Sequence, residues 1–309
     1  LVLVRRAPSF RRFPYTALAG PALDRVERDL QDAAAVRRAT AGVDIVQHVA
    51  GIAGIWGPWS HYYGVNVLGT EHVVAACRAE GVPRLVYTSS PSVTFGGEHQ
   101  SGIDETAPYP EKWLCHYPHT KAIAERHVLA ANDPPNLMTC ALRPHLIWGP
   151  RDENLIPRLI ARASRGRLRR IGDGTNRVDM IYVANAAEAQ LQAADALRPG
   201  SPVCGKAYFL SQGEPVNCWG WINEILESAG ITPVRKSVSL RAALRIGRTF
   251  EILYTLLRLR GEPPLTRFLA LQLATDHWFD ISAARQDFAY SPAFPRKKGC
   301  GGSPSRSEG

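Results

Sequence analysis

One tyrosine in this chain has a lysine four residues later, a spacing that places both side chains on the same side of a helix. Of the ten tyrosines, only Tyr117 has this partner, which is Lys121. A free tyrosine hydroxyl has a pKa of about 10 and a free lysine about 10.4, so neither transfers protons readily at neutral pH. A nearby ammonium favours the phenolate, which makes Tyr117 a candidate proton donor and acceptor. Such chemistry suits the reduction of a carbonyl, or the oxidation of an alcohol, beside a nicotinamide ring.

The pair by itself also fits an ordinary exposed helix start, so the surrounding elements decide its meaning. Pro118 follows Tyr117 directly, where the first turn of a helix tolerates a missing N–H. Apolar strands and helices alternate along the first two thirds of the chain. Strands are expected over 43–50, 84–88, 138–143 and 207–210, and helices over 67–80, 117–131 and 184–197. This alternation predicts an α/β fold with a doubly wound parallel sheet.

The composition is that of a large globular protein. The chain has 309 residues, 45% apolar and 21% charged, with a formal net charge of +9. That charge admits nucleic acid, an acidic membrane surface or an anionic cofactor as partner, and the absence of a nucleic-acid motif argues against the first. Six scattered cysteines without a C-x-x-C pair favour neither a metal site nor disulfides, so we expect a cytoplasmic protein. No uncharged apolar run approaches the roughly 20 residues of a membrane span.

A family resemblance rests on motifs that flank the Tyr117 pair. The strand 84–88 is followed by Ser89 and Ser90, and Leu142-Arg143-Pro144-x-x-Ile147-x-Gly149-Pro150 follows the pair. In this combination the chain resembles the extended short-chain dehydrogenases, and within them the 3β-hydroxysteroid dehydrogenase branch of the epimerase/dehydratase superfamily. Further segments, over 139–150, 206–209, 213–215 and 261–269, are similar to bacterial 2-alkyl-3-ketoalkanoate reductases of olefin biosynthesis.

The resemblance implies a Rossmann-type fold and an NAD(P)H-dependent oxidoreductase that interconverts a ketone and a secondary alcohol. The expected substrate is a small apolar keto or hydroxy compound, a 2-alkyl-3-ketoalkanoate, with an NAD-dependent 3β-hydroxysteroid or sterol dehydrogenase as the alternative. The helix expected over 240–259 is interpreted as a lid over an acyl-chain pocket, with a plain buried helix as the alternative. A peripheral membrane contact, a contact with a pathway enzyme and a homodimer also stay open.

Residue by residue, the resemblance assigns the proton transfer to three side chains. Tyr117 donates the proton to the carbonyl oxygen, and Lys121 lowers the pKa of Tyr117 and binds the nicotinamide ribose. Ser90 holds the carbonyl oxygen, with Ser89 and Ser92 as alternatives. Turn chemistry at a strand end is the competing explanation for these serines.

The cofactor set implied by the resemblance is larger. Asp29 would contact the adenine and Asn66 would stand at a helix start, and a simple N-cap explains either residue as well. Arg5 and Arg6 end a strand where an acid would bind the ribose of NAD and an arginine accommodates the 2′-phosphate of NADP. We therefore expect NADP, with NAD as the alternative; two surface arginines are the competing explanation. With Tyr117 and Lys121, the set is Arg5, Arg6, Asp29, Leu30, Ala50, Gly51, Asn66, Pro144 and Ile147.

One part of the family pattern is missing from this sequence. The first strand, its Gly-rich turn and the first helix have no counterpart, which predicts an N-terminally truncated chain or another segment in their place. A catalytically impaired, cofactor-free binding protein is therefore an open alternative. The expected domains are a dinucleotide-binding domain over 1–150 with 178–211, and a substrate domain over 151–177 and 212–292. The tail over 293–309 is expected to be disordered.

Overall fold

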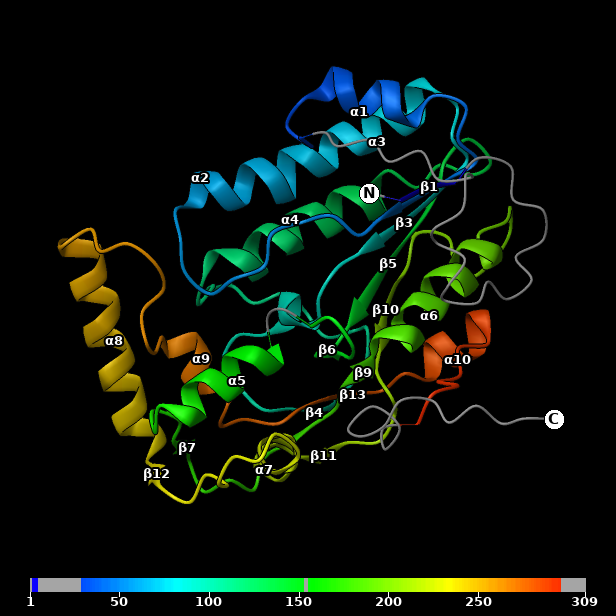
Figure 1. The fold of residues 1–309 in the computed structure, drawn as a ribbon. Coiled ribbons are helices and arrows are strands. Elements are labelled where there is room, and N and C mark those ends of the chain that lie inside the picture. Colours follow the sequence, from blue (N-terminus) through cyan, green and yellow to red (C-terminus); the bar gives the residue numbers. More distant parts are fainter. Residues whose placement is uncertain (1, 5–28, 153–154, 296–309) are drawn as a thin grey trace.

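The computed structural model describes residues 2–4, 29–152 and 155–295 (Figure 1). Its largest sheet has five strands in the order β1-β2-β3-β5-β10. The strands are β1 (Val2–Val4), β2 (Ile45–His48), β3 (Arg84–Thr88), β5 (Met138–Pro144) and β10 (Ala207–Leu210). The last four are parallel to one another, as the alternation of strands and helices predicted.

The first strand departs from that prediction because β1 is antiparallel to β2, with Leu3 opposite Val46. It fills the position next to β2 that the sequence had left without a partner. An antiparallel neighbour forms backbone hydrogen bonds without a crossover helix between the two strands. In the structure, β1 thus occupies the edge of the sheet beside β2.

Alternating strand residues face opposite sides of this sheet, so both faces are covered by helices. Leu85 and Tyr87 pack with α1 (Ala33–Thr40), α3 (Gly69–Ala79) and α4 (His116–Ala130). Val86, between them, packs with α6 (Val183–Ala196) and α10 (Ser282–Phe288). Figure 1 shows these two helical layers on either side of the strands.

A second sheet of four strands, in the order β11-β8-β13-β4, joins distant parts of the chain. Its strands are β4 (Gln100–Ile103), β8 (Arg177–Val178), β11 (Val216–Asn217) and β13 (His277–Phe279). Two pairs accompany it: β6 (Ile147–Trp148) with β9 (Ile181–Tyr182), and β7 (Arg170–Ile171) with β12 (Ser237–Val238). The second sheet therefore takes one strand from the first half of the chain.

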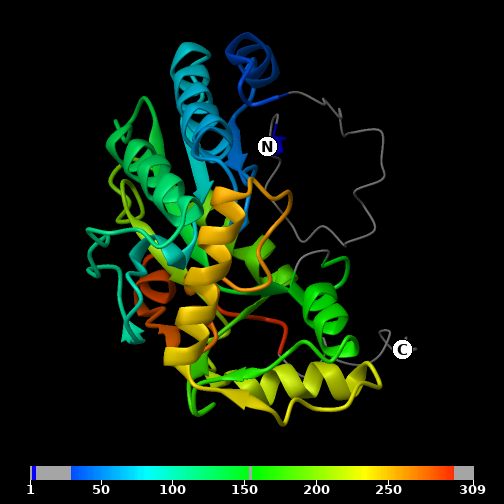
Figure 2. The same cartoon turned by 90° about the vertical axis from the view of Figure 1, so that its left-hand side faces the viewer.

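Four further helices lie in the second half of the chain. They are α5 (Leu155–Ser164), α7 (Cys218–Ser228), α8 (Leu240–Leu256) and α9 (Arg267–Gln272). Both views place α7 at the end of the molecule opposite α1 and α3 (Figure 2). Among the described residues, no helix is long and apolar enough to cross a membrane.

A buried ion pair connects α4 to the central sheet. Arg143 on β5 donates to Glu125 on α4 from Nε at 3.0 Å and from Nη2 at 2.6 Å. The hydroxyl of Tyr109 donates to the same carboxylate at 2.6 Å. Glu125 is fully buried and Arg143 is 3% exposed, so each charge depends on its partner for compensation. The pair fixes the helix that carries Tyr117 and Lys121 against the strand next to β3.

We predict that Glu125→Gln lowers the free energy of unfolding by about 3–5 kcal/mol, because it leaves the Arg143 guanidinium buried without its counter-charge. Urea titration followed by tryptophan fluorescence measures this loss. The matched control is Arg37→Gln, which breaks the surface pair of Arg37 with Glu80 and is expected to cost no more than about 1 kcal/mol. Equal losses for the two variants would contradict the prediction.

Candidate active site

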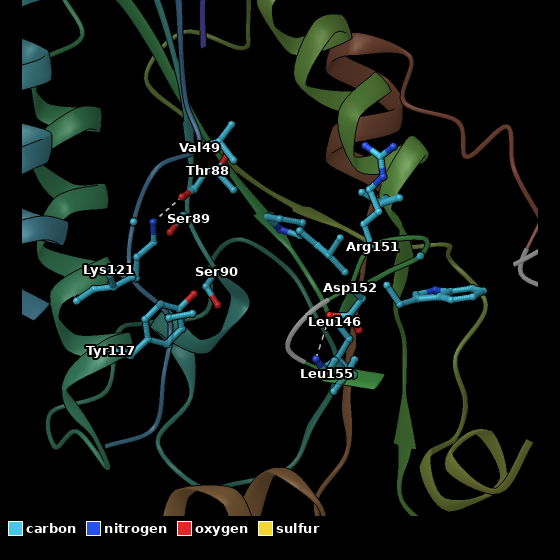
Figure 3. Close-up of a pocket in the computed structure, with 18 of the residues that line it drawn as sticks. Val49, Thr88, Ser89, Ser90, Tyr117, Lys121, Leu146, Arg151, Asp152 and Leu155 are labelled. Carbon is cyan, nitrogen blue, oxygen red and sulfur yellow. Dashed lines mark hydrogen bonds between the residues drawn. The ribbon is translucent and has the colours of Figure 1, made fainter. Parts of the chain in front are cut away.

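The carboxyl ends of three neighbouring parallel strands meet at one cavity of about 540 Å³, as expected for an open α/β sheet. Loops after β2, β3 and β5 form most of its wall, and α4 adds Tyr117 and Lys121 (Figure 3). Six of the residues predicted from the sequence line this cavity: Gly51, Ser90, Tyr117, Lys121, Pro144 and Ile147. The structure thus brings the proposed proton-transfer residues together from segments far apart in the chain.

Ser90 lies two residues beyond the end of β3. The backbone N–H of Ser89 donates to the Leu142 carbonyl at 2.6 Å, which extends the pairing of β3 with β5 to the edge of the cavity. Ser90 also caps a short 3₁₀ helix (Pro91–Thr94), and its Oγ lies 2.8 Å from Oγ of Ser92. The turn role predicted as the competing explanation is therefore observed at Ser90, which also lines the cavity.

Tyr117 lies in the first turn of α4, which begins one residue earlier, at His116. Figure 3 shows its hydroxyl turned toward Ser90. Burial raises the pKa of Tyr117 above its ordinary value, while the Ser90 hydroxyl acts in the opposite direction. The expected lowering of this pKa is therefore wrong for the protein as it stands. A raised pKa keeps the phenol protonated at neutral pH, which suits a proton donor.

Lys121 follows one turn later and is 5% exposed. Its Nζ donates to the Thr88 carbonyl at 2.6 Å and lies 4.2 Å from the centre of the Tyr87 ring (Figure 3). Burial lowers the pKa of Lys121 to about 7, against the opposing effect of Glu125. The amine is thus close to half protonated at neutral pH, and it is held by a backbone carbonyl rather than by Tyr117.

A second cavity, of about 400 Å³, lies on the other side of Ser90 and Tyr117. The two cavities share six lining residues: Ala53, Ser90, Tyr117, Pro144, Leu146 and Leu155. Most of the second wall is apolar, with Leu159, Leu168, Phe268 and Leu269 among its residues. Ser90 and Tyr117 therefore border two spaces at once, one with more polar groups and one suited to an apolar ligand.

Asn66 does not line the first cavity but holds the loop after β2 that does. It lies within a π-helix (Tyr63–Leu68) between α2 (Trp59–Tyr62) and α3, so the expected place at a helix start is wrong. Its side chain accepts from the Ile52 N–H at 2.9 Å and donates to the Ile52 carbonyl at 3.1 Å. A Cβ on Gly51 would lie 3.1 Å from Oδ1 of Asn66. Asn66 thus holds the loop after β2 in place, and glycine at 51 leaves the cavity floor open.

Several other predicted cofactor residues do not line the cavity. Asp29 is exposed and accepts from the Gln31 N–H at 2.9 Å, while the N-cap of α1 is Asp32 rather than Asp29. Leu30 lies against Gly69, and Ala50 lies between the lining residues Val49 and Gly51 without lining the cavity itself. Arg5 and Arg6 fall outside the described residues.

Two parts of the cavity walls were not expected from the sequence, namely the segment after Pro150 in the first cavity and α9 in the second. Arg151 and Asp152 line the first cavity, and Asp152 caps α5 by accepting from the N–H groups of Leu155 and Ile156 at 3.0 and 2.8 Å. The second cavity takes residues from α9 and none from α8. Leu253, Leu256 and other α8 side chains are exposed, so the plain buried helix is wrong for α8. Ile252 and Leu256 line a third cavity, of about 790 Å³, and the lid stays a prediction.

The first cavity fits the nicotinamide half of a dinucleotide. Gly51 supplies backbone without a side chain, and Lys121, Thr88 and Ser89 supply polar groups. Oγ of Ser89 is buried and has no hydrogen-bond partner among the described residues, so it is available to a ligand. These features agree with the close backbone approach that a cofactor needs at a sheet edge.

Comparisons with known proteins agree with this arrangement. The sequence model of the 3-beta hydroxysteroid dehydrogenase/isomerase family matches residues 21–241. The 2-alkyl-3-oxoalkanoate reductase of Stenotrophomonas maltophilia is 50% identical over 94% of this chain and 88% of its own length. The enzyme of the same name from Shewanella oneidensis is 46% identical over 93% of this chain and 76% of its own length.

The fold has solved relatives as well. A dTDP-glucose 4,6-dehydratase from Streptomyces venezuelae, solved with NAD bound, superposes with a TM-score of 0.68 at 21% identity, covering 91% of this chain and 78% of that one. That likeness shows an α/β fold with a parallel sheet of the NAD-binding epimerase and dehydratase type. The family match and the two reductases show more, because they extend over most of the chain at high identity. The chain therefore belongs to the 3-beta hydroxysteroid dehydrogenase/isomerase family, a branch of the extended short-chain oxidoreductases, which act on keto or hydroxy groups.

Proposed function

We propose that this protein is an NAD(P)H-dependent reductase of 2-alkyl-3-oxoalkanoates, which turns the ketone of a β-keto acid into a secondary alcohol. The observation that carries the proposal is the 50% identity with a 2-alkyl-3-oxoalkanoate reductase over 94% of the chain. The second cavity supports it, because an apolar space next to Ser90 and Tyr117 suits a substrate with alkyl chains.

The chain's own residues divide the work at the carbonyl. The Ser90 hydroxyl donates a hydrogen bond to the ketone oxygen, and the Tyr117 phenol transfers its proton to that oxygen as negative charge develops on it. Lys121 binds the nicotinamide ribose and, as an ammonium, stabilises the phenolate that Tyr117 becomes. The bound nicotinamide supplies the hydride. The mostly apolar wall of the second cavity lowers the polarity around this group, which strengthens each interaction.

NADP is the proposed cofactor, with NAD as the alternative. The proposal rests on Arg5 and Arg6 and on the lack of an acid beside them in the sequence. Asp29, Leu30 and Ala50 are proposed to contact the cofactor outside the described cavity. Arg151 lines the cavity and adds a cation that a phosphate could pair with.

The finer architecture is part of the proposal. The dinucleotide-binding domain would comprise 1–150 with 178–211, in a doubly wound sheet that lacks the Gly-rich first turn. The substrate domain would comprise 151–177 and 212–292. The strand β4 is an exception to this division, since it pairs with β13 in the second sheet.

Two other functions have a specific observation in their favour. The family name and the apolar second cavity favour a 3β-hydroxysteroid or sterol dehydrogenase. The Gly-rich turn of the family pattern has no counterpart in the sequence, which favours a dehydrogenase-like binding protein that does not turn over substrate.

We expect the purified protein to oxidise NADPH in the presence of a 2-alkyl-3-oxoalkanoate, as measured by absorbance at about 340 nm, and Tyr117→Phe to lower kcat by about 10²–10⁴-fold. Phenylalanine keeps the ring and removes only the proton donor. The control Tyr208→Phe removes a phenol that donates to the Asp287 carboxylate and lines neither cavity, so it should leave kcat close to that of the wild type.

A 3-ketosteroid assayed in parallel separates the enzyme alternatives. Turnover of the steroid alone would favour the steroid dehydrogenase. If neither substrate is reduced and NADPH fails to quench tryptophan fluorescence, the binding-protein alternative replaces the proposal.

The lowered pKa of Lys121 gives a prediction about stability. An unfolded lysine titrates near 10.4, so the cost of burying its charge is full below pH 7 and is relieved as the pH rises from about 7 to about 10. We therefore expect Lys121→Met to raise Tm at pH 6.5 by several degrees, a gain of at least about 1 kcal/mol, while it weakens cofactor binding.

Thermal unfolding at about pH 6.5 and about pH 9.5 measures the effect, and the gain should be smaller at the higher pH. Lys206→Met is the control, because Lys206 is exposed and pairs with Asp287 at the surface. A lower Tm for Lys121→Met at both pH values would contradict the expected cost of burial.

A further inference from the structure

A histidine and an aspartate that the proposed mechanism does not use lie at the wall of the second cavity. Nδ1 of His145 lies 2.7 Å from Oδ1 of Asp179. His145 lines the cavity, and the Asp179 side chain beneath it is fully buried. The pair lies outside the serine, tyrosine and lysine set.

The hydrogen bonds of the Asp179 carboxylate show which nitrogen of the His145 ring remains free. Oδ2 of Asp179 accepts from the Phe279 N–H at 3.0 Å, so both carboxylate oxygens act as acceptors. Nδ1 of His145 therefore carries a hydrogen and donates it to Asp179. Among the described residues Nε2, on the opposite side of the ring, has no hydrogen-bond partner.

Strand register brings Pro144, the residue before His145, level with Ser90, which would hold the ketone oxygen of the substrate. Thr88 pairs with Leu142, so Ser90 and Pro144 each lie two residues beyond that pair on adjacent strands. Adjacent strands are about 4.8 Å apart. Pro144 and Leu146, on either side of His145, line both cavities. His145 thus shares the wall of the second cavity with Ser90 and Tyr117, where a ketone oxygen would be held.

We propose that Nε2 of His145 binds the carboxylate of the β-keto acid, while Asp179 holds the ring in position; this inference rests on the proposed function. In such an acid the carboxylate carbon is two bonds from the ketone carbon, so its ligand must lie next to Ser90 and Tyr117. A protonated imidazole donates a charge-assisted hydrogen bond to a carboxylate.

The other cations of the cavity are less suited to this task. Arg158 on α5 is paired with Glu262. Arg162 makes no hydrogen bond or ion pair through its guanidinium to another described residue, but its Cα lies about 10 Å further along α5 than that of Leu155, which borders both cavities. His277 on β13 lies 6.1 Å from His145 between ring centres, and its Nε2 is engaged with Thr275 at 2.9 Å.

The test compares a charged substrate with a neutral one. A 2-alkyl-3-hydroxyalkanoic acid and its methyl ester are oxidised with NADP⁺, which avoids the spontaneous decarboxylation of β-keto acids. His145→Gln should raise KM for the acid by about tenfold to hundredfold, with a much smaller change for the ester. His277→Gln is the matched control in the same cavity, and it should affect acid and ester alike.

The wild type supplies a second measurement that needs no variant. The acid should have a lower KM than its methyl ester, because only the acid presents a carboxylate to Nε2 of His145.

Equal losses on acid and ester in His145→Gln, or equal KM values of the wild type for acid and ester, would overturn the inference and leave the proposed function standing. If the wild type oxidises neither compound, the proposed function fails together with the inference. Should His145→Gln not fold, the wild-type comparison of KM values decides alone.

Discussion

The pairing of β3 with β5 sets the position of nearly every group at the site. Five consecutive residue pairs hold these strands in register, and the Ser89 N–H continues the ladder beyond them. Since parallel strands end at the same edge, Ser90 from one loop and Pro144 from the other arrive together. A slip of one residue would turn every β3 side chain to the opposite face. The chemistry therefore depends on a backbone ladder more than on any contact between the catalytic side chains themselves.

The helix α4, which faces this edge, carries two buried residues of opposite charge. Glu125 receives Arg143 and Tyr109 in the interior, and Lys121, one turn before Glu125, extends toward the cavity and the Thr88 carbonyl. Two buried charges of opposite sign on one helix face moderate each other, and Glu125 opposes the effect of burial on Lys121. The stability of the core and the protonation of the site are thus coupled through one helix.

Local patterns in the sequence predicted the central strands and helices and the residues at the centre of the site. The strands 84–88 and 207–210 were predicted at their observed bounds, and the helix expected over 184–197 differs from α6 by one residue at each end. Their apolar periodicity and their Gly and Pro boundaries are encoded locally. Spacing and motif likewise placed Ser90, Tyr117 and Lys121 around one cavity.

What failed depended on contacts between distant residues. The strand β4 lies in a segment without β-strand periodicity, and it forms because β13, more than 170 residues later, pairs with it. The position of Asn66 inside a π-helix and the capping of α1 by Asp32 instead of Asp29 are choices among similar local options. The pKa of Lys121 follows from burial, which spacing along one helix does not reveal.

The two cavities that meet at Ser90 and Tyr117 also bear on handedness. On the proposed function, a ketone oxygen held at these hydroxyls would have the nicotinamide in the first cavity and its substituents in the second, of about 400 Å³. The face of the ketone that receives the hydride would then follow from the order in which its two substituents lie along the second cavity.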